Sequence, residues 1–214
     1  MALTFPLATS VFADVIGIQS APLRPKPGRE LSGMGSGQII EADLTPTLWV
    51  ADVVTRPWRA EMARRVEAMV NAVIRSKGTV YLYDPRKAVP VSDPGGTILG
   101  ASAVKINSVP DAKSLSLKGL PASYKLSVGD YLAFDYGDPA RRAFHEIAED
   151  ITANGSGVTG AFEVSPFIRA GATANLTVTL VKPAFKAKIV PGSVDVRQLD
   201  AAFSQISFSV VQKL

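Results

Sequence analysis

Short runs of alternating apolar and polar residues, broken by glycine or proline, restrict the fold of this chain more than any other feature. The apolar members of these runs are Val104 and Ile106, Leu115 and Leu117, Leu132 and Phe134, Leu176, Val178 and Leu180, and Ile206, Phe208 and Val210. Side chains two residues apart share one face of a β-strand, so each run predicts a strand with one buried face. Many short strands joined by turns are typical of a sandwich or a barrel.

One segment, residues 58–77, has a helical period instead. Its apolar stripe consists of Met62, Val66, Met69, Val70 and Val73. Residues spaced by three and four positions share one face of an α-helix, and such a face usually packs on the sheet of its own domain. We expect Thr55 to cap this helix, with Pro57 in its first turn and Gly78 just past its end.

The first 56 residues predict extended runs separated by breakers. "SVFADVIGIQS", residues 10–20, alternates Phe12, Asp14 and Ile16 on one face, so we expect the first strand here and not a signal peptide. "LRPKPGRE", residues 23–30, is expected to form a loop because its prolines interrupt a ladder of hydrogen bonds. "GQIIEADLTPTLWVADVVT", residues 37–55, offers two further strands.

Composition and charge exclude several classes of partner. No run approaches the roughly 18 apolar residues that a helix needs to span a bilayer, so we expect a soluble protein with no membrane partner. The net charge is +4, and the lysines and arginines are scattered singly or in pairs, which does not favour a specific nucleic-acid interface. The absence of cysteine excludes disulfides, thiolate nucleophiles and thiolate metal sites.

The only histidine, His145, is the first candidate for chemistry. Glu146, Glu149 and Asp150 follow it closely. No nucleophile motif such as G-x-S-x-G accompanies it, and there is no second histidine for a metal site. On a strand, His145 and Glu146 would point to opposite faces. We therefore expect a histidine at the surface or at an interface, and not a catalytic one.

The segment around His145 allows two local structures. The spacing of Phe144, Ile147 and Ile151 permits a short helix, whereas Phe162 and Val164 alternate as in a strand. The intervening "ANGSG" is typical of a turn, since Asn and Gly tolerate positive φ. We favour a β-hairpin whose second strand ends at Pro166.

Aspartates and tryptophans form the second group of candidates. The carboxylates Asp130, Asp135 and Asp138 could serve glycoside hydrolysis, but aspartate beside glycine or proline is more typical of turns. Trp49 lies in an alternating run and is expected in a core or an interface, and Trp58 is expected to anchor the start of the helix.

A glycine-rich stretch, "SGMGSG" at residues 32–37, could suggest a phosphate-binding loop. It lacks the Lys-Ser/Thr ending and is not followed by a predicted helix, so a loop or a turn at a strand edge is expected. The sequence thus predicts no enzyme, no catalytic residue, no cofactor and no metal site.

Several stretches, taken in order, resemble the distal tail proteins of long-tailed bacteriophages. They are "ELSGMGSGQIIEADLTPTLWVADV" (residues 30–53), "RSKGTVYLYDP" (residues 75–85) with the following loop at Pro90, "LSVGDYLAFDYG" (residues 126–137) with the segment from Ala143 to Gly171, and the closing "SFSVVQKL" (residues 207–214). The resemblance spans roughly residues 30–214, and the order of these short motifs carries it.

This resemblance implies a structural protein of the virion tail tip or baseplate, made in the cytoplasm of a bacterial host. It implies self-association into a ring, commonly a hexamer, that joins the tail tube protein to the tail hub protein. The implied fold is mainly β with one helix (α+β): residues 1–95 form a belt-like split barrel or sandwich with helix 58–77, and residues 96–214 an all-β, sandwich-like domain. Alternatives are another tail subunit (tube, terminator or minor tail protein) or a carbohydrate-binding or carbohydrate-cleaving module.

Overall fold

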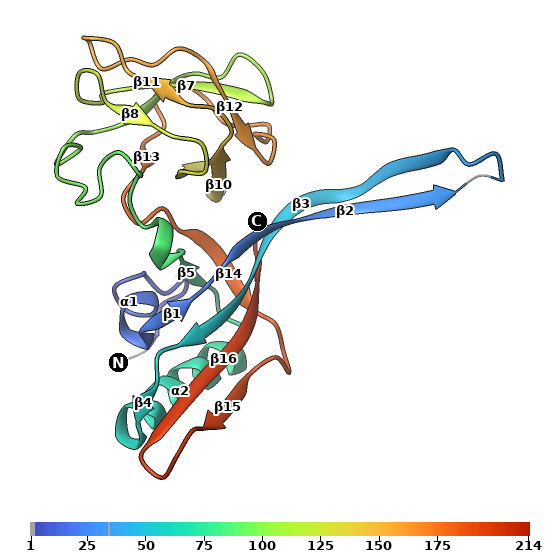
Figure 1. Ribbon diagram of the computed structural model, residues 1–214, viewed down its shortest axis with the longest axis vertical. Coiled ribbons are helices and arrows are strands. Elements are labelled where there is room, and N and C mark those ends of the chain that lie inside the picture. Colours follow the sequence, from blue (N-terminus) through green and yellow to red (C-terminus); the bar gives the residue numbers. More distant parts are fainter. Residues whose placement is uncertain (1–2, 34) are drawn as a thin grey trace.

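The computed structural model describes residues 3–33 and 35–214 and is mainly β, with 42% of residues in strands and 11% in helices. The α+β fold class predicted from the alternating runs is therefore confirmed. Figure 1 shows two bodies, one above the other, and a long two-stranded ribbon that projects from the point where they meet. Among the described residues, no helix is long and apolar enough to cross a bilayer.

An eight-stranded sheet with two helices makes up the first body. The main strand order is β1 (Ile18–Ser20), β3 (Ile39–Thr55), β16 (Phe203–Gln212), β14 (Phe185–Ile189) and β5 (Val80–Leu82). Off this path, β2 (Leu23–Gly33) pairs with β3, whereas β4 (Trp58–Arg59) and β15 (Asp195–Gln198) pair with β16. The helices are α1 (Ala13–Ile16) and α2 (Ala60–Arg75), and a short 3₁₀ helix, η1 (Pro85–Lys87), follows β5.

The second body contains a six-stranded sheet and a two-stranded sheet. The order of the larger sheet is β13 (Val178–Thr179), β9 (Tyr131–Tyr136), β10 (Arg141–Ile147), β12 (Phe162–Ser165), β7 (Ser114–Lys118) and β6 (Lys105–Ser108). The smaller sheet pairs β11 (Ile151–Thr152) with β8 (Lys125–Leu126). Leu115, Leu117, Leu132 and Phe134 are all buried here, as their alternation predicts.

Helix α2 confirms the helical stripe. Val66, Val70 and Val73 are buried in the hydrophobic cluster of the first body, and Met69 is partly buried against it. The cap was predicted wrongly, because the N-cap residue is Arg59 and it makes no side-chain cap. Thr55 instead ends β3, where its Oγ1 accepts a hydrogen bond from the Ile206 backbone N–H at 3.1 Å.

The start of the chain differs from the predicted first strand. Residues Ala13–Ile16 are helical, and only Ile18–Ser20 are extended. Phe12 and Ile16 are both fully buried, which a helical spacing of four residues allows on one face. Gly17, with φ of 63°, then turns the chain into β1.

The expected loop at "LRPKPGRE" is also wrong, since these residues belong to β2. Strand β2 pairs with β3 alone, so its other edge is free and Pro25 and Pro27 remove no ladder hydrogen bond. The two strands expected over residues 37–55 are one strand, β3, which spans 17 residues.

The antiparallel pairing predicted around His145 is confirmed, but the turn at "ANGSG" does not join the paired strands directly, because Ile151 pairs with Leu126 of β8. Strand β10 pairs antiparallel with β12 through Glu146 and Ser165, and β12 ends immediately before Pro166. The link between them includes β11, and Asn154 forms the expected turn by accepting the backbone N–H groups of Ser156 and Val158.

The predicted division at residues 95 and 96 does not match the sheets. Strands β14 and β16 lie in the first body, where they pair with β5 and β3. The second body is therefore an insertion between β5 and β14. A period-two pattern shows which face of a strand is buried but not which strand lies beside it, and this is why the return of the chain was missed.

Trp49 joins the two bodies. It is fully buried at the middle of β3, and its indole Nε1–H donates to the Phe144 carbonyl in the second body at 2.9 Å. Its ring contacts Phe144 and Tyr131 edge-on, with centroids 5.2 and 5.7 Å away. The expectation of a core or interface position for Trp49 is confirmed.

Candidate functional site

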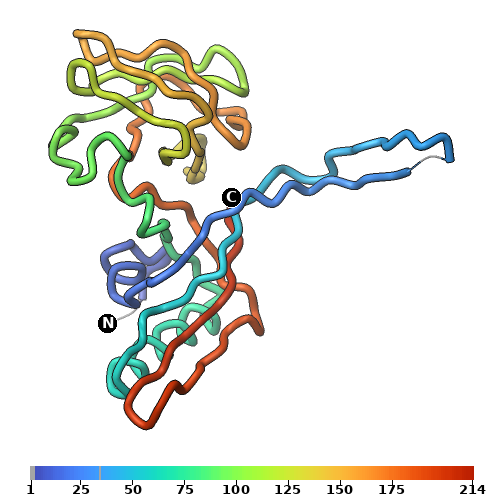
Figure 2. Tube along the Cα trace, in the orientation of Figure 1, coloured from blue at the N-terminus to red at the C-terminus, as the bar shows by residue number. Residues whose placement is uncertain are grey.

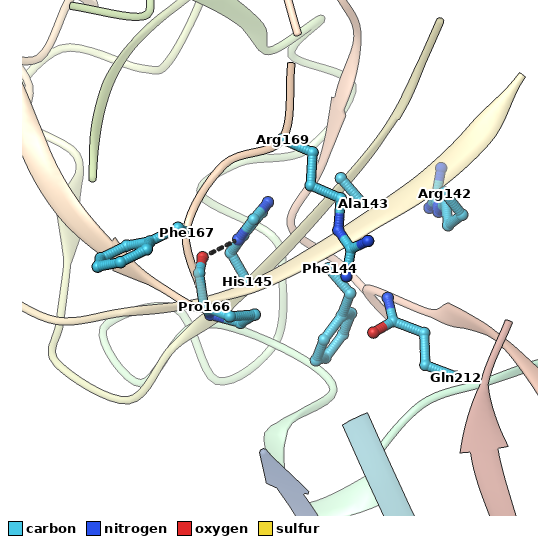
Figure 3. A pocket seen from close by; sticks show the side chains of 8 residues that line it. All are labelled: Arg142, Ala143, Phe144, His145, Pro166, Phe167, Arg169 and Gln212. Carbon is cyan, nitrogen blue, oxygen red and sulfur yellow. Dashed lines mark hydrogen bonds between the residues drawn. The ribbon is translucent and has the colours of Figure 1, made fainter. Parts of the chain in front are cut away.

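His145 lies inside the second body and is only 3% exposed, so its predicted surface position is wrong. Its Nδ1 lies 2.7 Å from the Pro166 carbonyl, as Figure 3 shows, and its ring stacks on Phe134. Within the described part of the chain, Nε2 has no hydrogen-bond partner. The cavity beside the ring measures about 10 Å³, the space of roughly one water molecule.

Burial is the main cause that lowers the pKa of His145 to about 4; the hydrogen bond to Pro166 opposes this shift, and the positive charge of Arg169 adds to it. The ring is therefore neutral near pH 7. A neutral ring whose Nδ1 lies against the Pro166 carbonyl is suited to holding the segment after β12 in place.

The three candidate aspartates do not converge. Asp130 is buried and accepts the backbone N–H groups of Ser127 and Val91 at 2.8 and 2.9 Å, which closes a turn. Asp138 lies in the turn between β9 and β10, as predicted. Asp135 belongs to β9 and not to a turn, and it pairs with Arg142 at 3.2 Å. No group of acids or His145 that could hold a metal occurs among the described residues.

Trp58 is half-buried, and one face of its ring is covered. It lies in β4 directly before α2, as its predicted role at the helix start requires, and its Nε1–H donates to the Ile16 carbonyl at 2.8 Å. The guanidinium of Arg56 covers the ring at 3.9 Å from the centroid. Trp49 is fully buried and therefore forms no exposed binding platform.

The prominent exposed feature is the outer part of the β2–β3 ribbon, residues 28–45, which we call the arm. Figures 1 and 2 show that it extends away from both bodies. "SGMGSG" falls at its tip, where residues 35 and 36 form a turn; Met34 lies outside the described residues. The arm positions its side chains through the antiparallel register that pairs Arg29 with Asp43 and Gly33 with Ile39.

The arm carries apolar side chains without a partner surface in the described chain. Leu31 and Ile39 are 68% and 72% exposed, and the register places them on the same face, diagonally across the two strands. Nearer the bodies, that face carries Arg29 with Glu41 and Asp43, at 2.9 and 2.7 Å. Exposed ion pairs of this kind contribute about 0–1 kcal/mol each, too little to hold a ribbon straight.

A groove of about 600 Å³ lies between the base of the arm and the second body. One wall consists of Arg29 and residues 43–47, and the other of Ala148 and residues 163–169. Arg169 ties the two walls together, because its Nη2 donates to the Thr47 carbonyl at 3.2 Å. Phe167 lines the groove and is 61% exposed.

The sequence contained only part of the signal for this site. The glycine-rich turn at residues 32–37 indicates a change of direction. The strand that leads to it was not predicted, because the prolines at 25 and 27 are typical of a loop. Phe167 lies just after a strand-ending proline and gives no periodic signal.

Neither a scan against protein-family models nor a search of curated proteins found a match to this chain. Its function is therefore inferred from the arm and the groove.

Proposed function

We propose that this protein is a structural, non-enzymatic ring component of a phage or phage-like tail, which joins the tail tube to the tail-tip hub. The proposal takes the identity of the assembly from the resemblance to distal tail proteins. Self-association, its central part, has independent physical support in the arm.

The arm is the observation that carries the proposal. A two-stranded ribbon in water is marginally stable by itself and needs a third strand or a packing surface. The arm has neither within the described chain, yet it extends Leu31 and Ile39 into solvent on one face. Exposed apolar side chains on a projecting element are typical of a protein–protein contact.

The direction of the arm favours a ring over a twofold dimer. The arm points away from its own bodies, so it can reach a body surface of another copy, which is a patch unlike the arm itself. Contacts between unlike patches are head-to-tail, and they close into a ring when the rotation per subunit is suitable. The hexameric count is an expectation from the resemblance.

The placement of the polar candidates agrees with a structural role. His145 and Asp130 bond to backbone groups, whereas Asp135 pairs with a neighbouring side chain. In these bonds the three residues have no partner in common. In the groove, Arg29 pairs with Asp43, and Arg169 donates to the Thr47 carbonyl.

Electron microscopy of the purified full-length chain, alone and with the tube and hub proteins of its own particle, tests the proposal. We expect closed rings of one size with a central opening, present as a single ring per tail. Many stacked rings per particle would indicate a tube subunit instead. A strict monomer under all these conditions would contradict the proposal.

A further inference from the structure

We infer that the groove at the base of the arm is the acceptor site for the distal arm of a second copy of the chain. This inference rests on the proposed function, and it adds the site at which the ring subunits join. It names the surface that the head-to-tail contact requires.

The apolar parts of the two surfaces correspond. On the acceptor side, Phe167 and Leu44 line the groove from opposite walls and are both largely exposed. On the inserted side, Leu31 and Ile39 form one apolar face at the end of the arm. In Figure 3 the Phe167 ring points away from His145 and Arg169, and the side chain is 61% exposed. Packing an aromatic ring with two aliphatic side chains is a common centre for a protein interface.

The charges of the two surfaces are complementary at long range. Residues 28–45 contain three acidic side chains and one basic, whereas the complete chain has a net charge of +4. The rest of the molecule is therefore distinctly basic. At the groove, Glu163 and Arg169 offset each other, and Lys113 adds a positive charge 5.9 Å from the centroid of the Phe167 ring. An acidic arm is attracted to such a body during encounter.

The arm of the same copy cannot occupy this groove. Residues 43–47 already form one wall, and the ladder between β2 and β3 continues outward from them to Gly33 and Ile39. The end of the arm thus extends away from both bodies, as the backbone trace in Figure 2 shows. A second copy is the occupant whose arm has both the required apolar face and the required charge.

Cysteine cross-linking tests the inference on the full-length chain, which contains no cysteine of its own. Two single variants, Ile39→Cys and Phe167→Cys, are mixed, assembled and oxidised. Because a disulfide requires Cα atoms about 4.4–6.8 Å apart, a mixed dimer forms only if the arm tip lies in the groove. We expect mixed dimers between these two variants and none between Ile39→Cys and Val91→Cys, the control at a similarly exposed position.

The outcomes separate this inference from the proposed function. If rings form without any cross-link between positions 39 and 167, the groove is not the acceptor site, but the proposal of a ring still stands. Cross-linking of position 167 only to an added tube or hub protein assigns the groove to that partner and also overturns the inference. A chain that never self-associates contradicts both proposals.

A substitution in the groove gives a second measurement that does not depend on cysteine. Phe167→Glu places a like charge opposite the acidic arm and is expected to weaken self-association by roughly tenfold or more. Phe167→Leu keeps an apolar side chain at the same position and is expected to retain assembly. Equal association constants for the two variants, measured by sedimentation, would overturn the inference.

Discussion

Two residues, His145 and Trp49, show how single side chains define the second body and its attachment. His145 is buried and keeps one nitrogen close to the Pro166 carbonyl, which fixes the start of the segment that carries Phe167 and Arg169. Trp49 contributes a hydrogen bond and two edge-on aromatic contacts across the junction of the bodies. Both residues were natural candidates for chemistry or ligand binding in the sequence, and both serve packing.

The titration of His145 predicts a loss of stability in acid. Burial lowers its pKa to about 4 from the ordinary value of 6.5. As the pH falls below about 6.5, the unfolded chain takes up a proton that the folded chain refuses until about pH 4. The contribution of His145 to the free energy of unfolding is therefore complete above about pH 6.5 and is lost between about pH 6.5 and pH 4. At roughly pH 4.5 the loss is about 2–3 kcal/mol.

Urea unfolding of the wild type and of His145→Gln at neutral pH and at roughly pH 4.5 measures this contribution. The wild type should lose more free energy of unfolding than the variant, by the amount given above. An identical loss of unfolding free energy in the two proteins would show that the folded state does not lower the pKa of His145.

The arm is the element whose register matters most, and Gly28 controls it. A Cβ atom added at Gly28 would lie 1.7 Å from Thr45 Oγ1 and 3.1 Å from the Thr45 backbone oxygen. The strands approach closely here, between the two irregularities of the β2–β3 register. Gly28→Ala should push the strands apart at the base of the arm.

Hydrogen exchange of the arm amides checks this effect. We expect Gly28→Ala to accelerate exchange over residues 29–43 by about tenfold, because a weakened ladder opens more often. The second substitution Thr45→Gly should restore part of the protection. Gly33→Ala is the control, since nothing lies within 4 Å of its added Cβ. Equal effects of the two alanine variants would contradict the account.

Elements with a local signal could be predicted from the sequence. Helix α2 follows from the spacing of Val66, Val70 and Val73, because the contacts that bury this face repeat along the same segment. Strand β9 follows in the same way from Leu132 and Phe134.

Elements whose burial depends on distant partners were missed. Strand β2 contains Pro25 and Pro27, and only the free outer edge explains why they are tolerated. Strand β14 returns to the first body because it pairs with β5 and β16, which a period-two pattern does not specify. The groove was missed for the same reason, since its walls are separated by more than a hundred residues.

At the scale of the whole molecule, the fold combines two packed bodies with an arm that packs against neither of them along its outer part. The eight-stranded sheet packs against α2, and the second body is attached to it through Trp49. The arm extends away from both bodies (Figure 1), and its side chains Leu31 and Ile39 are largely exposed. In the proposed ring, each copy needs one surface that inserts into a neighbour and one that accepts a neighbour. The arm would be the inserted surface, and the bodies would carry the accepting one.

The mass of the full-length assembly, measured by light scattering for the wild type and for the double variant Leu31→Asp/Ile39→Asp, tests self-association through the arm most directly. The wild type is expected to have the mass of a closed oligomer, and the double variant that of a folded monomer, because two charges replace the apolar face. The variant Val91→Asp, altered at a similarly exposed site outside the arm, should assemble like the wild type. An oligomer of unchanged mass in the double variant would contradict the account.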